Sequence, residues 1–465
     1  MKPLKKLNIS GKEVLPLVEG GKGVAVSNGL TAGAWAAAGG VGTFSCVNPD
    51  SYDENGKPIP QIYHGKTRRD RFQELKDYAI QGGIEQARIA HKTANGNGRI
   101  HMNVLWEAGG TEEILHGVLK ETKGLIHGVT CGAGMPYGVA EIAASYEVFY
   151  HPIVSSARAF SALWKRSYKK IPQWLGGVVY EDPWLAGGHN GLSNAEDPNQ
   201  PQSPYSRVAD LRKVMRDFGL DETPIIMAGG VWYLRDWENW IDNDELGPIA
   251  FQFGTRPLLT KESPISDAWK ARLIELEEGD ILLQNFSPTG FYSSAVKNEM
   301  LLELQARNMR QVEYRAKPEE GFEAELKLGP RGRPVYLKEE DLPTAQEYIE
   351  DGFTEGMKTP DNTLMFVEPE TAREILADQA ACMCCLSQCR FSNWADNEEG
   401  TTGRRADPRS FCIQKALQTI AHTDDIEHGL MFSGHNGYMF KKDPFYSNGF
   451  VPSVAELVAR IASGD

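Results

Sequence analysis

The sequence contains no long apolar run free of polar residues and glycine. Its longest weakly polar stretch, residues 30–47, holds four glycines together with Thr31, Thr43 and Ser45. A membrane span needs about 20 consecutive, predominantly apolar residues, so this stretch instead predicts a helix followed by a strand. The basic N-terminal segment also lacks the apolar stretch of a secretory signal. We therefore expect a cytoplasmic protein with no membrane partner.

Lysine and arginine are too few, and too scattered, to form a basic stripe. The 465 residues include 49 Lys and Arg against 63 Asp and Glu, a net charge of −14. Binding to nucleic acid requires clustered positive charge that neutralises phosphates, so we expect no nucleic-acid partner. With 41% hydrophobic and 24% charged residues, the composition is that of a globular protein with a sizeable core and excludes a disordered chain.

Apolar runs rich in β-branched residues alternate with helical patterns through the first 260 or so residues. This alternation is typical of βα units with a parallel sheet, and a (β/α)₈ barrel uses about 250 residues. Eight strands are predicted: Val14–Glu19, Gly40–Ser45, Ile100–Leu105, Leu125–Thr130, Glu147–Val154, Gly176–Glu181, Pro224–Ala228 and Ile249–Phe253. The predicted fold class is thus α/β, a TIM (β/α)₈ barrel with a mostly helical C-terminal extension.

Composition changes after about residue 265. We predict a barrel over residues 1–265, a helical extension with a cysteine cluster over 266–428, and a closing segment over 429–465. Within the extension, the Pro-, Gly- and charge-rich stretch 317–334 is predicted to be a linker.

Three glycine strings follow predicted strands six, seven and eight. They are AGGH at Ala186–His189, MAGGV at Met227–Val231 and QFGT at Gln252–Thr255. Barrel active sites lie at the carboxyl ends of the strands, and a phosphate commonly binds between the last two loops. Glycine there lets backbone N–H groups approach a phosphate closely. If only one of these loops contained glycine, we would interpret the glycine as part of a tight turn. Glycine in both loops favours the interpretation as a phosphate site.

His189 ends the first of these strings. An imidazole titrates near neutral pH and can serve as a general base. A structural histidine bonded to a carbonyl is the alternative, but the position at a strand's carboxyl end favours a catalytic role.

Several motifs in order carry a family resemblance. EGGKGVAVSNGLTAGAWAAAGGVGTFS, HMNV, GAGMP, AGGHNG, MAGGV and QFGT resemble the nitronate monooxygenase (2-nitropropane dioxygenase-like) family and the related flavin-dependent enoyl-ACP reductases. The resemblance implies a barrel that binds FMN at its mouth, with His189 as the base that removes a proton next to a nitro group, or as a polar contact to a carbonyl. The closing SGHNGY resembles a segment that returns to the flavin.

The residues expected at the cofactor follow from these motifs. They are Gly20, Gly21 and Lys22 along the flavin ring, Asn103 bonded to it, Gly229, Gly230, Gly254 and Thr255 at its phosphate, and also Gly187, Gly188, Gln252, Gly434 and Asn436. Many relatives have an uncharged residue where the first loop reads EGGKG. Lys22 would either stabilise a negative charge on the flavin or be solvated.

Five of the seven cysteines cluster late in the chain. Cys382, Cys385 and Cys389 have C-x-x-C-x-x-x-C spacing, and Cys412 follows. Four thiolates can hold a [4Fe–4S] cluster, and the run is similar to that of the 2,4-dienoyl-CoA reductase group, in which the fourth cysteine comes sooner. Zinc or buried free thiols are the alternatives, and Cys384 has no assigned role.

Two further features have a structural interpretation. The adjacent carboxylates Glu181 and Asp182 are interpreted as a solvated face or as helix N-terminal charge. Trp184 either walls the pocket or belongs to the core.

The sequence therefore predicts an FMN-dependent oxidoreductase acting on a small molecule, most concretely the oxidation of an alkyl nitronate by O₂. One alternative is an NAD(P)H-dependent reductase of enoyl thioesters or quinones, which an iron–sulfur cluster would favour. The other is a non-catalytic flavin-binding subunit. A homodimer is possible.

Overall fold

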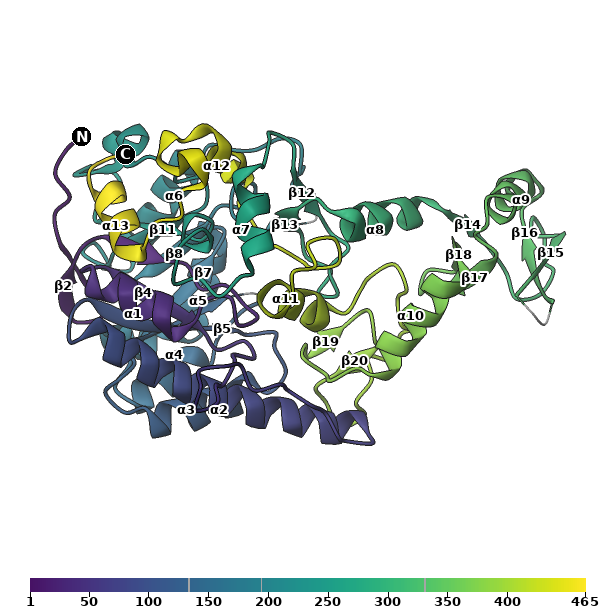
Figure 1. Cartoon of the computed structure of the whole chain (residues 1–465), viewed down its shortest axis with the longest axis horizontal. Helices are drawn as coiled ribbons and strands as arrows, with labels where there is room; N and C mark the ends of the chain where they lie inside the picture. The colour runs from purple at the N-terminus through teal and green to yellow at the C-terminus, as the bar shows by residue number, and fades with distance from the viewer. Residues whose placement is uncertain (133, 194, 330–331) are drawn as a thin grey trace.

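The first half of the chain forms a closed barrel of eight parallel strands (Figure 1). The computed structural model describes all residues except Ala133, which falls in the GAGMP motif, Asn194, and Pro330 and Arg331, which fall in the predicted linker. Around the barrel the strands are β3 (Leu17–Glu19), β4 (Val41–Ser45), β5 (Arg99–Leu105), β6 (Gly128–Gly132), β7 (Phe149–Val154), β8 (Val178–Glu181), β10 (Ile225–Ala228) and β11 (Ile249–Phe253). All eight predicted strands are confirmed, with ends shifted by a few residues.

Helices connect successive strands and surround the barrel. They are α1 (Gly29–Ala37), α2 (Arg68–Ala94), α3 (Thr111–Glu121), α4 (Val139–Ser145), α5 (Ala157–Arg166) and α6 (Pro204–Asp217). A 3₁₀ helix, Leu234–Trp240, lies between β10 and β11. The weakly polar stretch 30–47 is α1 followed by β4, as predicted. Gly42 is required there, because a Cβ at this position would lie 1.7 Å from the Ala32 carbonyl oxygen of α1.

The end of the chain comes back to the barrel. Helix α13 (Val454–Ala462) packs on α1, and both chain termini lie on the same side of the molecule (Figure 1). A capping box fixes the start of α13, since Ser453 accepts from Glu456 N and the Glu456 carboxylate accepts from Ser453 N. The apolar face of the helix, Val454, Leu457, Val458 and Ile461, joins the main barrel core.

The extension combines helices with small antiparallel sheets. Its helices are α7 (Asp267–Ile274), α8 (Glu299–Met309), α9 (Leu342–Glu350), α10 (Pro369–Ala380), α11 (Ile413–His422) and α12 (Met439–Lys442). Its strands are β12 (Ile281–Gln284), β13 (Ser293–Val296), β14 (Gln311–Glu313), β15 (Ala324–Leu328), β16 (Arg333–Leu337), β17 (Glu355–Lys358), β18 (Thr363–Val367), β19 (Gln388–Cys389) and β20 (Trp394–Ala395). Strands β14 to β18 and α9 form a unit that projects away from the barrel (Figure 1).

The prediction of a linker over 317–334 is wrong. Strands β15 and β16 pair as an antiparallel hairpin across this stretch. Leu326, Val335 and Leu337 are buried in a small separate core, so the charged residues of the stretch form the outer face of a sheet. Alternation of apolar and charged residues is the strand signal that overrides the Pro and Gly content.

Within the described residues, no helix is long and apolar enough to cross a membrane.

A histidine pair fills the amino-terminal end of the barrel. The hairpin formed by β1 (Leu7–Ile9) and β2 (Lys12–Val14) brings Ser10 beneath the strands. Its hydroxyl lies 2.8 Å from His101 Nε2 and 2.9 Å from His151 Nε2, and the two rings are 4.3 Å apart. Both imidazoles are fully buried. Burial lowers both pKa values, that of His151 to about 3.

This pair is expected to make the fold sensitive to acid. As the pH falls below about 6.5, histidines of the unfolded chain take up protons that the folded protein does not accept. The free energy of unfolding should then fall by up to about 1.4 kcal/mol per pH unit for each buried histidine. Urea unfolding between pH 7.5 and 5 should show a shallower loss for His151→Gln than for the wild type. The exposed His64 provides the matched control His64→Gln, and parallel curves for all three proteins would contradict the account.

Candidate active site

One cavity opens at the carboxyl ends of the barrel strands. It encloses about 1410 Å³, part of it open solvent. The predicted catalytic residue and all the predicted cofactor residues line it, although they come from five barrel strands with the loops that follow them, and from the closing segment. They are Gly20, Gly21, Lys22, Asn103, Gly187, Gly188, His189, Gly229, Gly230, Gln252, Gly254, Thr255, Gly434 and Asn436. The structure thus gathers these residues in one place, and their binding of FMN stays a prediction.

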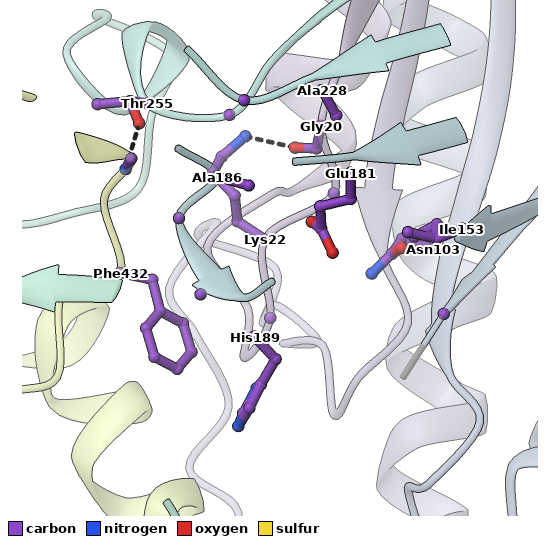
Figure 2. Close-up of a pocket in the computed structure, with 18 of the residues that line it drawn as sticks. Gly20, Lys22, Asn103, Ile153, Glu181, Ala186, His189, Ala228, Thr255 and Phe432 are labelled. Atoms are coloured by element: carbon purple, nitrogen blue, oxygen red, sulfur yellow. Dashed lines mark hydrogen bonds between the residues drawn. The ribbon is translucent and has the colours of Figure 1, made fainter. Parts of the chain in front are cut away.

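The glycines after β10 and β11 shape one end of this cavity. Gly229 and Gly230 have φ of 101° and 78°, a left-handed conformation that favours glycine. A Cβ on Gly254 would meet no atom within 4 Å, so its backbone borders open space. The Gly434 N–H donates to Thr255 Oγ1 over 2.8 Å, which ties the closing segment to the loop after β11 (Figure 2).

Two polar side chains of the cavity lining, Arg256 and Asn436, each contain a nitrogen that makes no hydrogen bond to a described residue. Asn436 Nδ2 and Arg256 Nη2 are buried without a hydrogen-bond partner among the described residues. Arg256 is otherwise held firmly, since Nη1 donates to Trp232 O over 3.0 Å and Nε donates to Tyr446 Oη over 3.2 Å. Arg256 Nη2 also lies 3.8 Å from Asp443 Oδ2, and both side chains are buried, so the charge of this guanidinium is already paired with a carboxylate. Sequence reasoning missed Arg256, although it directly follows the QFGT string.

The first loop contains a buried ion pair. Lys22 Nζ donates to Glu19 Oε1 over 3.2 Å and to Gly20 O over 2.8 Å. The Lys22 side chain is 14% exposed and that of Glu19 is fully buried, so the alternative of a solvated Lys22 is wrong. Burial lowers the pKa of Lys22 and raises that of Glu19, and their mutual attraction opposes both shifts. Glu19 therefore offsets the positive charge that Lys22 brings to the cavity.

His189 is held by the extension as well as by the barrel. It ends β9 (Gly188–His189), which pairs with β13. Its Nε2 lies 2.7 Å from Ser287 Oγ, and its ring meets that of Phe432 edge to face at 5.6 Å. Burial lowers the pKa of His189 to about 4, so the imidazole is neutral at pH 7.

The interpretation of Glu181 as part of a solvated face is wrong. Glu181 is the last residue of β8 and lines the cavity, where its side chain lies between those of Lys22 and Asn103 in Figure 2. Burial, and then the charge of Asp182, raises its pKa to about 8. Asp182 itself accepts from the N–H groups of Trp184 and Leu185 and caps that turn. The sequence signal that could have placed Glu181 in the site is its position at the carboxyl end of a predicted strand, where barrel active sites lie.

A Glu181→Gln variant is expected to lose one step of the pH profile. Below about pH 8 the Glu181 carboxyl is protonated, so glutamine imitates it, and activity at pH 7 should stay within about threefold of the wild type. Above pH 8 the wild-type carboxyl ionises and places a negative charge in the cavity, whereas the amide does not. Measurement of kcat/KM from pH 6 to 9.5 should show a change near pH 8 only in the wild type. If kcat/KM changes near pH 8 in both proteins, a group other than Glu181 causes the change.

The cavity roof is apolar and belongs to the extension. Ile413 and Leu417 of α11 lie over the mouth with Leu386 and Phe432. Gln414 is the polar residue of α11 at this wall. The sequence pattern identifies α11 as amphipathic but contains no signal for which surface it covers. Trp184, by contrast, is buried outside the cavity lining and belongs to the core, one of its two alternatives.

The structure does not support the predicted [4Fe–4S] cluster. The predicted ligands are Cys382, Cys385, Cys389 and Cys412, yet the described residues contain no group of three or more His, Cys, Asp or Glu that could hold a metal. Cys382 Sγ is instead 3.0 Å from Ser392 Oγ, and Cys385 lies in the cavity wall. All five cysteines pack in an apolar cluster, which fits the alternative of buried free thiols.

The fold and the cavity define a class of protein. This is a (β/α)₈ barrel with a cavity at the carboxyl ends of its strands, roofed by an added C-terminal region. The chain belongs to the nitronate monooxygenase family, whose profile matches residues 6–463. Membership of that family makes the protein an oxidoreductase.

Solved structures agree on the fold. FabK from Thermotoga maritima matches with a TM-score of 0.51 and 13% identity, over 97% of this chain and 92% of that one. Nitroalkane oxidase from Streptomyces ansochromogenes matches with a TM-score of 0.50 and 14% identity, over 97% and 95%. The enoyl reductase domain of MlnA from Bacillus amyloliquefaciens matches with a TM-score of 0.53 and 11% identity, over 97% and 93%. No curated protein sequence matches the chain.

Proposed function

We propose that this protein is an FMN-dependent oxidoreductase that oxidises an alkyl nitronate with O₂. The observation that carries the proposal is one cavity whose lining combines the glycines after β10 and β11 with two titratable side chains, Glu181 and His189. The nitronate monooxygenase family to which the chain belongs supports the reaction class.

The residues present fit FMN. Gly229, Gly230, Gly254 and Thr255 would hold its phosphate, with Asn436 Nδ2 as an additional donor. Gly20, Gly21, Asn103 and Gln252 would lie along the ring, where Gly21 is needed because a Cβ there would lie 2.3 Å from Asn103 Cβ. When bound, FMN supplies the acceptance and return of electrons.

The protein's own groups would orient the substrate. His189 is neutral and lies beside the apolar roof, so it can make a polar contact to a nitro or nitronate group. Ile413, Leu417 and Phe432 exclude water and contact the alkyl portion.

The apolar roof also suits a second candidate, an NAD(P)H-dependent reductase of an enoyl thioester, because an acyl chain would occupy the same wall. Two assays on the FMN-loaded protein separate the candidates. Oxygen consumption with a propionate-3-nitronate-type substrate and no nicotinamide supports the first. NAD(P)H oxidation that depends on an enoyl thioester or a quinone, without nitronate turnover, would replace the first with the second.

A further inference from the structure

His189 is fixed to the extension through both its backbone and its side chain. In the β9–β13 pairing, Ser293 lies opposite His189. The loop between β12 and β13 carries Ser287, whose Oγ lies 2.7 Å from His189 Nε2 and whose side chain is 1% exposed. The nitrogen left for a ligand is therefore Nδ1.

The loop that carries Ser287 is braced on both sides of this residue. Gly290 N donates to Ser287 O over 2.9 Å, which closes a turn. Ser410 Oγ donates to the preceding carbonyl, Phe286 O, over 2.6 Å. The turn closed by Gly290 therefore positions Ser287 beside the imidazole, whereas Ser410 contacts only the preceding carbonyl.

Thr289 extends the contact into a chain of hydroxyls. Its Oγ1 accepts from Phe291 N over 3.2 Å and lies 3.0 Å from Ser287 Oγ. If Thr289 donates to Ser287, then Ser287 donates to His189 Nε2, and each hydroxyl proton has an acceptor. In the opposite direction the Thr289 proton would go to solvent, because Thr289 is only half-buried. The first direction keeps both hydroxyl protons bonded within the protein, and we adopt it for the proposal.

We propose that Ser287 and Thr289 are positioning residues that hold His189 in its Nδ1–H tautomer, so that the imidazole donates a hydrogen bond to a substrate oxygen. The proposal rests on the proposed function, in which His189 faces the substrate. A neutral imidazole has one donor and one acceptor nitrogen, and here the acceptor, Nε2, is already occupied by Ser287.

This assignment changes the role of His189 from the predicted general base to a donor. A nitronate is already deprotonated at carbon and carries its negative charge on oxygen, so it needs no base. An N–H group aimed at that oxygen stabilises the bound anion. A substrate carbonyl would receive the same hydrogen bond, so the class of substrate is an oxygen acceptor with an attached apolar chain.

The tautomer can be measured directly by NMR of the FMN-loaded full chain labelled with ¹⁵N-histidine. The His189 signals are identified by their absence in His189→Gln. We expect a protonated Nδ1 and an unprotonated Nε2 in the wild type, and a mixture of tautomers in Ser287→Ala and Thr289→Val. Both variants should also lower kcat about tenfold with KM within about twofold, while Ser287→Thr, which keeps the hydroxyl, restores both readouts.

Ser410→Ala provides a matched control, because it removes a hydroxyl that braces the same loop without entering the hydroxyl chain. It should leave the tautomer unchanged. A protonated Nε2 in the wild type, or a tautomer that neither Ser287→Ala nor Thr289→Val alters, would overturn the proposal. If a variant does not fold, the tautomer of His189 in the wild-type protein still tests the proposal. Absence of bound FMN would contradict the proposed function, whereas the tautomer remains readable in that protein.

Discussion

His189→Ala is expected to lower kcat by a factor between about 10² and 10⁴, the usual range for a positioned group that acts in the transition state. The residue lies in the cavity at the end of β9, beside Phe432 and against Ser287. Alanine removes the hydrogen bond to substrate but leaves the glycine-lined end of the cavity untouched. Steady-state kinetics on the FMN-loaded protein measure the loss.

The FMN content of the variant is the control for this experiment. It should equal that of the wild type, because the glycines after β10 and β11 and Thr255 are unchanged. His189→Gln, whose amide can still donate a hydrogen bond, should retain more activity than His189→Ala. Full turnover of His189→Ala on every nitronate and every NAD(P)H-linked acceptor tried would show that the assignment of His189 is wrong.

Gly254→Val is expected to weaken FMN binding strongly while leaving the fold intact. The backbone of Gly254 lacks the positive φ that would strain a side chain, and a Cβ there meets no protein atom within 4 Å. The Cβ of the valine would therefore enter the space assigned to the phosphate without meeting a protein atom. We expect FMN affinity to fall by at least about 100-fold, equivalent to about 2.7 kcal/mol, as measured by flavin fluorescence on titration.

A graded series separates exclusion of the ligand from damage to the barrel. Gly254→Ala should weaken FMN binding less than Gly254→Val, and both variants should unfold at the wild-type Tm in the absence of FMN. Wild-type FMN affinity in Gly254→Val would place the phosphate elsewhere in the cavity.

The barrel could be predicted from sequence because each strand is a short β-branched run that ends in glycine or a polar residue. Strand β10, for example, reads IIMA and runs directly into Gly229 and Gly230. The glycine strings predicted the cavity lining for the same reason, since their spacing depends on local backbone geometry and on where barrel strands end.

The rest of the site depends on contacts between distant parts of the chain. Ser287 meets His189 across 98 positions, and Arg256 is held by Tyr446 across 190. Neither contact has a local sequence signal. The solvated-face interpretation of Glu181 fails because a carboxylate pair in sequence does not reveal which member points inward. Glu181 is the last residue of β8 and lines the cavity, whereas Asp182 follows the strand and caps the turn.

The predicted cluster rests on the spacing of the cysteines alone. That spacing matches a cluster motif, but it does not determine how the sulfur atoms are placed in the fold. In the structure, Cys382 pairs with Ser392 and Cys385 turns to the cavity wall.

The visible absorption spectrum of the anaerobically purified protein tests the central claim most directly. A flavin spectrum, with stoichiometric FMN released on denaturation, is the result that this account predicts. A colourless protein that takes up no added FMN would contradict it.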